Sequence, residues 1–135
     1  MQRLILASRL AGWIAVLAIA VLSLVPGEMR PRVLSVSQVE HVLAYMAAGS
    51  TLTFGYFRRR NVAMIAALLP LYAALLEVLQ IWVPGRVSRL IDVAAGTLGT
   101  WIGIGMILLI HRIVAIPTTS LHPPRSAPAQ AQEAE

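Results

Sequence analysis

The sequence predicts an all-α membrane protein, a bundle of four transmembrane helices without a separate water-soluble domain. The 135 residues are 58% hydrophobic and only 13% charged, whereas a soluble domain keeps about a quarter of its residues charged. The apolar residues form four runs, each close to the ~20 residues that cross ~30 Å of hydrocarbon. Helices that are apolar on every side have no place to be buried in so short a chain, so lipid must be their solvent.

The first run covers residues 10–25 and follows Arg3 and Arg9. A basic start before an apolar stretch is typical of a signal peptide, but no small-x-small cleavage site follows. We therefore interpret the run as a retained first helix. A connector rich in proline, glycine and charge, residues 26–37, separates it from the second run.

The remaining runs predict helices over residues 39–57, 62–83 and 90–116, with Pro70 inside the third. A basic turn at residues 58–60 joins the second helix to the third. After residue 117 the composition changes to Pro, Ala, Ser, Gln and Glu, which buries too little apolar surface to fold. We thus expect a transmembrane domain over residues 1–116 and a disordered cytoplasmic tail over residues 117–135.

The arginines predict the orientation, because cytoplasmic segments carry an excess of basic residues. Four crossings place seven arginines on one side, namely Arg3, Arg9, Arg58, Arg59, Arg60, Arg112 and Arg125. The other side holds four, namely Arg30, Arg32, Arg86 and Arg89. We therefore expect both termini to be cytoplasmic. The arginines flank apolar runs and do not line an exposed face, which argues against nucleic acid as a partner.

Glu77 is the most informative polar residue. It lies six residues before the predicted end of its helix, about 9 Å along the axis at 1.5 Å per residue, while half of the hydrocarbon core is about 15 Å. A charged side chain at the bilayer centre costs about 2.5–3.5 kcal/mol, so Glu77 must face the bundle. Gln80 shares its face at i+3. Acids inside membranes usually belong to functional sites; the alternative is a polar clamp between helices.

Other polar residues fall at the same predicted depth. Glu40, His41 and Tyr45 open the second helix, Arg86 lies in the last connector, and Asp92 opens the fourth helix. Each one alone is also explained as a helix start or an interfacial anchor. Because all lie toward the outer ends of their helices, we expect them to converge with Glu77 and Gln80 in one outward-facing pocket.

Several kinds of chemistry have weaker support. Glu40, His41, Glu77 and Asp92 are suitable metal ligands, but no HExxH-like spacing is present and only one histidine lies on this side. The sequence therefore predicts neither a metal site nor another cofactor. No context for a serine nucleophile is found, and the absence of cysteine excludes thiolate chemistry. The spacing Gly99-x-x-x-Gly103 predicts close helix packing.

The motifs together resemble the VanZ-like family of small bacterial membrane proteins. The motifs are Leu22-Ser23-Leu24-Val25-Pro26, then Glu40-His41 with Tyr45, Glu77-x-x-Gln80, Pro84-Gly85-Arg86, and Asp92 with Gly99. The resemblance covers roughly residues 10–110. Two positions depart from the family pattern: Glu40 stands for the usual Asp-Lys, and Gly96 for an Asn or Asp. The resemblance implies a location in the bacterial inner membrane and a role in the cell envelope, and the family's namesake is associated with low-level teicoplanin resistance.

Three hypotheses follow. In the first, the protein is an accessory or binding protein for a lipid or lipid-linked headgroup, with Arg86 meeting phosphate and Glu77 holding Arg86. In the second, it is an enzyme on such a headgroup, with Glu77 and His41 as acid and base. In the third, the polar cluster only holds the helices together. A transporter has less support, because four short helices enclose little room for a transport path unless the protein oligomerises. The sequence names neither a substrate nor an oligomeric state.

Overall fold

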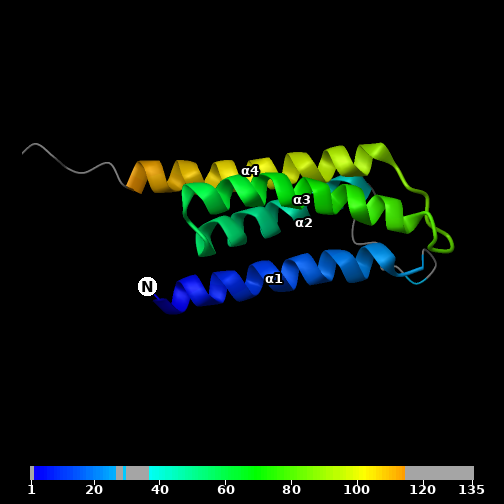
Figure 1. Cartoon of the computed structure of the whole chain (residues 1–135), viewed down its shortest axis with the longest axis horizontal. Coiled ribbons are helices and arrows are strands. Elements are labelled where there is room, and N and C mark those ends of the chain that lie inside the picture. Colours follow the sequence, from blue (N-terminus) through cyan, green and yellow to red (C-terminus); the bar gives the residue numbers. More distant parts are fainter. Residues whose placement is uncertain (1, 27–28, 30–36, 115–135) are drawn as a thin grey trace, which may run out of the picture.

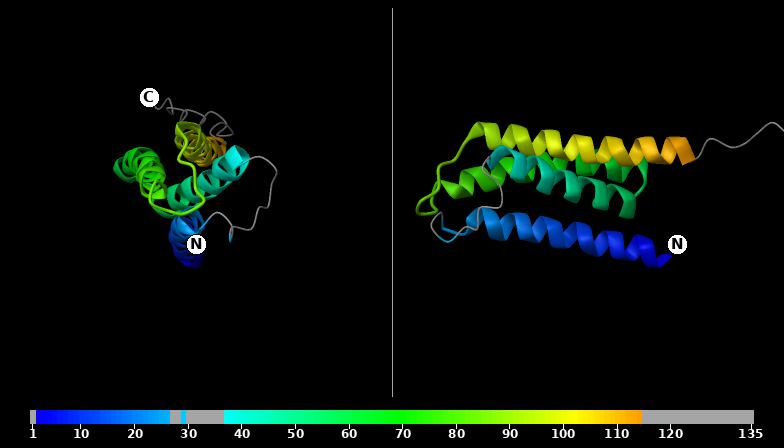
Figure 2. Two further views of the ribbon diagram at one scale, coloured as in Figure 1. Left: turned by 90° about the vertical axis from the view of Figure 1, so that its right-hand side faces the viewer. Right: turned by 180° about the vertical axis from the view of Figure 1, so that it is seen from behind.

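The structure is a computed structural model that describes residues 2–26, 29 and 37–114 (Figure 1). These residues form four helices and no strand: α1 (Gln2–Leu24), α2 (Ser37–Gly55), α3 (Arg59–Gln80) and α4 (Leu90–Val114). The all-α prediction is thus confirmed. The helices lie along one axis, and the start of α1 and the end of α4 lie at the same end (Figures 1 and 2).

The helix ends differ from the predicted ones. The first helix begins at Gln2 and not at residue 10, because Arg9 is accommodated within it. Arg9 Nε donates a hydrogen bond to the Gly55 carbonyl oxygen at 2.8 Å, and its guanidinium carbon lies 4.6 Å from the centre of the Tyr56 ring. The third helix starts at Arg59, continues through Pro70 and ends at Gln80. The predicted tail, and Arg30, Arg32 and Arg125, lie outside the described residues.

Three of the described helices, α1, α3 and α4, are long and apolar enough to cross a membrane. The remaining helix, α2, has 19 residues and includes Glu40 and His41, which lower its hydropathy. It shares its largest interface with α4 and the next largest with α1. Helix α2 is therefore packed against protein along much of its surface, and the polar residues need not face lipid.

Glycines permit the close contact between α2 and α4. A Cβ on Gly99 would overlap the carbonyl oxygen of Val42, and one on Gly103 would overlap that of Met46. By contrast, a Cβ on Gly105 would meet nothing within 4 Å. The close packing that the Gly99-x-x-x-Gly103 spacing predicts is confirmed, and the partner helix is α2.

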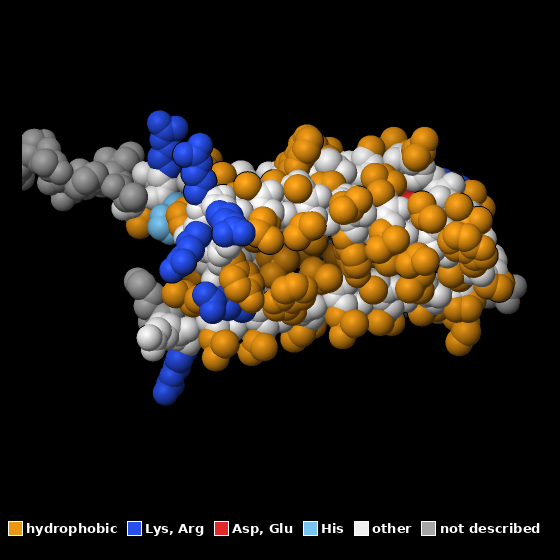
Figure 3. Space-filling model, viewed as in Figure 1, with side chains coloured by type: hydrophobic (Ala, Val, Ile, Leu, Met, Phe, Trp, Pro, Cys, Tyr) orange, Lys and Arg blue, Asp and Glu red, His pale blue; other side chains and the backbone are white. Residues whose placement is uncertain are grey.

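The outer surface is apolar. Large side chains such as Leu71 and Trp101 are 65% and 58% exposed, while alanines, leucines and the three tyrosines account for much of the interior and its edge. On the face in Figure 3, basic side chains gather at one end and hydrophobic side chains cover most of the rest. A soluble protein rarely exposes so much contiguous apolar surface, so this is a membrane protein.

Candidate functional site

Three polar side chains from three helices meet at one end of the bundle. His41 of α2, Glu77 of α3 and Asp92 of α4 each offer a nitrogen or oxygen atom, and these atoms lie within 4.8 Å of one another. Glu77 and Asp92 are 5% and 6% exposed, and His41 is half-buried. The sequence predicted that these side chains would converge, and the structure brings these three together; their roles stay a prediction.

The Glu77 carboxylate joins α3 to the connector that follows it. Its Oε2 atom accepts a hydrogen bond from the backbone N–H of Arg89 at 2.8 Å. Gln80, one turn further, is 3% exposed, so both residues face the protein and not lipid. Sequence reasoning missed this partner, because a backbone N–H carries no signature in the sequence.

Arg86 ties the same connector to the end of α1. Its Nε atom donates to the Val25 carbonyl oxygen at 3.1 Å, and its Nη2 atom donates to the carbonyl oxygen of Leu22. Carbonyl groups at the end of a helix lack partners within the helix, and an arginine satisfies them well. Gly85, with φ 72°, supplies the left-handed residue that turns the chain here. The Leu22–Pro26 and Pro84–Arg86 motifs are therefore in contact.

Asp92 has one buried oxygen atom without a partner in the described part of the chain. Its Oδ1 atom is fully buried and has no hydrogen-bond partner among the described residues. Its backbone N–H donates to the Arg89 carbonyl oxygen at 2.9 Å. A buried carboxylate oxygen without a partner is costly, so this atom marks a place where a ligand would be favourable.

Tyr45 and Glu40 complete the predicted set. Glu40 is half-buried at the start of α2. Tyr45 is 2% exposed and belongs to the core, so the alternative of an interfacial aromatic anchor is wrong. A Cβ on Gly96 would lie 3.1 Å from the Tyr45 ring. Gly96, where the family pattern usually has Asn or Asp, thus leaves room for the Tyr45 ring.

Comparison with known proteins identifies the family. The family model described as VanZ/LLP1 matches residues 5–111, a segment that reaches from α1 into the last turns of α4. The chain belongs to the VanZ-like family. No curated protein and no solved structure matches this VanZ-like chain.

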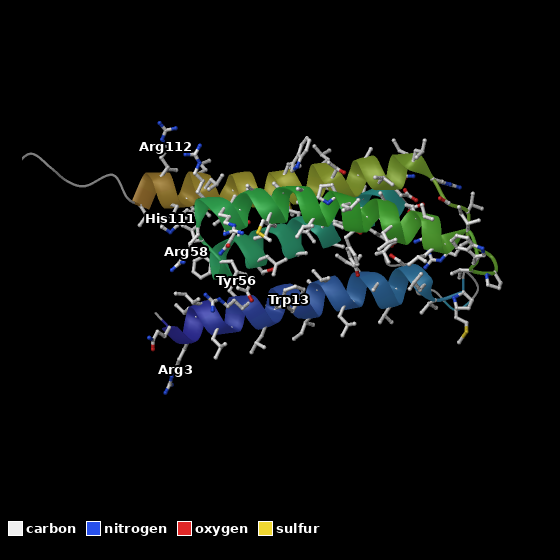
Figure 4. All side chains as sticks on the ribbon, in the orientation of Figure 1. Arg3, Trp13, Tyr56, Arg58, His111 and Arg112 are labelled. Atoms are coloured by element: carbon white, nitrogen blue, oxygen red, sulfur yellow. The ribbon has the colours of Figure 1, made fainter. Side chains whose placement is uncertain are left out.

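The opposite end of the VanZ-like bundle holds basic and aromatic residues (Figure 4). Trp13 Nε1 donates to the Tyr56 hydroxyl at 3.1 Å, and the Phe57 and His111 rings stack with centroids 3.8 Å apart. Beside them lies an apolar groove of about 580 Å³ between α1, α2 and α3. Its lining is almost entirely apolar and includes Trp13, Tyr56, Met64, Leu68 and Tyr72.

Proposed function

We propose that this VanZ-like protein crosses the bacterial inner membrane four times, with both termini in the cytoplasm. The start of α1 and the end of α4 lie at the same end of the bundle (Figure 1), which requires an even number of crossings. Since α1, α3 and α4 have the length and hydropathy of crossing helices, α2 has to make the fourth. Arg3, Arg58 and Arg112 share the end that holds the start of α1 and the end of α4 (Figure 4), and basic residues favour the cytoplasmic side.

We further propose that it is an accessory protein of the cell envelope that binds an anionic lipid or lipid-linked headgroup at the outer face. The observation that carries this proposal is the cluster of half-buried His41 with buried Glu77 and Asp92, at the end opposite the start of α1 and the end of α4. The connector between α3 and α4 contains Arg86 and Arg89. Arg86 donates a hydrogen bond to the Val25 carbonyl oxygen at the end of α1, whereas the side chain of Arg89 is exposed. An arginine whose backbone is fixed by Glu77 and whose side chain is exposed suits a lipid phosphate.

The test uses the purified full chain in lipid nanodiscs. Lipids that remain bound after exchange into a neutral lipid are extracted and identified by mass spectrometry. We expect an anionic lipid to remain with the wild type and with Arg59→Gln, and to be lost from Arg89→Gln. Arg59 is the matched control, because it is an exposed arginine at the start of α3, at the other end. Equal retention by all three proteins would refute headgroup binding at this connector.

A second candidate function is catalysis on the same headgroup, favoured by the approach of His41 and Glu77 to within 4.8 Å. Such a pair has the groups that general acid–base catalysis needs. Glu77→Gln separates the possibilities: an enzyme loses turnover and keeps binding, an accessory protein loses binding, and a structural bundle only loses stability. A lipidomic comparison of cells with and without the gene names the substrate class, and the teicoplanin susceptibility of the same cells tests the antibiotic link.

A further inference from the structure

Three side chains at one end of the bundle are of the types that bind metal ions. His41 offers a ring nitrogen, and Glu77 and Asp92 each offer a carboxylate oxygen, with all three atoms within 4.8 Å of one another. Ligand atoms around a tetrahedral zinc ion lie about 3.4 Å apart, given metal–ligand distances of about 2.0–2.2 Å. The 4.8 Å limit exceeds this separation by about 1.4 Å, so the side chains would rotate toward a bound ion. The three ligands come from three helices, so one ion would join α2, α3 and α4.

A second observation points independently to a ligand. Asp92 is 94% buried, being 6% exposed, and its Oδ1 atom has no hydrogen-bond partner among the described residues. The cluster also places two carboxylates in one buried place. A divalent cation would give Asp92 Oδ1 a partner and would balance the charge of the two carboxylates.

The chemistry of the donors selects the ion. Zinc accepts histidine nitrogen and carboxylate oxygen, and three protein ligands leave a fourth position open. Magnesium and calcium prefer ligand sets made of oxygen alone. Glu77 Oε2 accepts a hydrogen bond from the backbone N–H of Arg89 at 2.8 Å. This bond would orient the carboxylate, as hydrogen bonds from outer-sphere groups orient the ligands in metal sites.

We propose that His41, Glu77 and Asp92 bind one Zn²⁺ ion at the outward end of the bundle, with one coordination position open to a further oxygen ligand. The sequence predicts no metal, because no HExxH-like spacing is present and only one histidine lies on this side. The inference goes beyond the proposed function, since metal binding is measured with no headgroup present.

The experiment uses the full chain in detergent, purified without a histidine tag and stripped of metal with a chelator. Zn²⁺ is titrated in competition with a fluorescent zinc indicator, and Mg²⁺ is titrated as a comparison. We expect one Zn²⁺ per chain, no displacement by equimolar Mg²⁺, and an affinity at least about 100-fold lower for Asp92→Asn. His111→Ala is the matched control, because it removes a histidine that stacks on Phe57 at the other end, and we expect wild-type affinity.

Two results of the titration would overturn the proposal. In one, the wild type binds no Zn²⁺; in the other, Asp92→Asn binds Zn²⁺ as tightly as the wild type does. X-ray absorption of the zinc-loaded wild type keeps the test decisive if the variant does not fold. It should show a first shell of nitrogen and oxygen with one histidine ring. A spectrum with two or more histidines would place the ion elsewhere and also contradict the proposal.

Discussion

Replacement of Gly99 by alanine tests the packing that brings the site together. The added methyl group would overlap the Val42 carbonyl oxygen and lie 3.0 Å from Val42 C and Cα. Carbon atoms in favourable contact are about 3.5–4.0 Å apart, so α2 and α4 have to separate by about 0.5–1 Å. Overpacking of this kind costs about 1–3 kcal/mol, a large part of the ~5–15 kcal/mol that stabilises a typical domain.

Gly105→Ala is the matched control, because it makes the same chemical change on the same helix where a Cβ meets nothing within 4 Å. Alanine is a better helix former than glycine by about 1 kcal/mol, and this gain cancels in the comparison. SDS-induced unfolding in mild detergent, followed by circular dichroism, should show Gly99→Ala about 1–3 kcal/mol less stable than Gly105→Ala. Stabilities that agree to within about 0.5 kcal/mol would refute the reasoning.

The same variant reports on the site, because Val42 follows His41 on α2 and Asp92 lies on α4. A wider α2–α4 spacing draws His41 away from Asp92. We therefore expect Gly99→Ala to bind Zn²⁺ more weakly than Gly105→Ala. Equal affinities would show that the cluster does not depend on this interface.

Three further predictions concern orientation, the tail and Arg86. A reporter active only in the periplasm should be active when fused at Arg32 and silent at Arg60; the reverse pattern contradicts the orientation. A chain truncated after Pro117 should insert and accumulate like the full chain, because the tail has little apolar surface to bury, and a fall in its level on immunoblots would argue against this. Arg86→Gln should lower the free energy of unfolding by about 1.5–3 kcal/mol, since it removes charged donors to the Val25 and Leu22 carbonyls. Arg89→Gln keeps the N–H that Glu77 accepts and should stay near wild type in the same unfolding titration; equal losses would contradict the role of Arg86.

The expectations that came true rest on local patterns. Runs of apolar residues identified each of the four helices, and the small residues Gly99 and Gly103 marked a tight interface. The helix ends were less predictable, because a charge does not end a helix when a neighbouring helix accommodates it. Arg9 is the example. It lies within α1 because it donates a hydrogen bond to the carbonyl oxygen of Gly55, the last residue of α2, and packs over the ring of Tyr56, the next residue.

The sequence predicted which residues form the site better than it predicted their hydrogen bonds. Glu77 was expected to face the bundle because a charged side chain in the hydrocarbon core is costly in free energy, and it is 5% exposed. Its hydrogen bond to the Arg89 N–H and the two bonds from Arg86 to α1 depend on how the connector folds. Those contacts join residues that no periodicity or spacing relates.

The sequence by itself determined that this chain belongs in a membrane, because hydropathy is a sum over neighbouring residues and needs no fold. It also determined which acids cannot face lipid, since that cost depends only on depth along a helix. The tertiary structure alone decided that His41, Glu77 and Asp92 approach within 4.8 Å and that Asp92 Oδ1 is buried without a partner. The reason is that these distances depend on the rotation and spacing of three helices, which the α2–α4 glycine contact and the folded connector establish together.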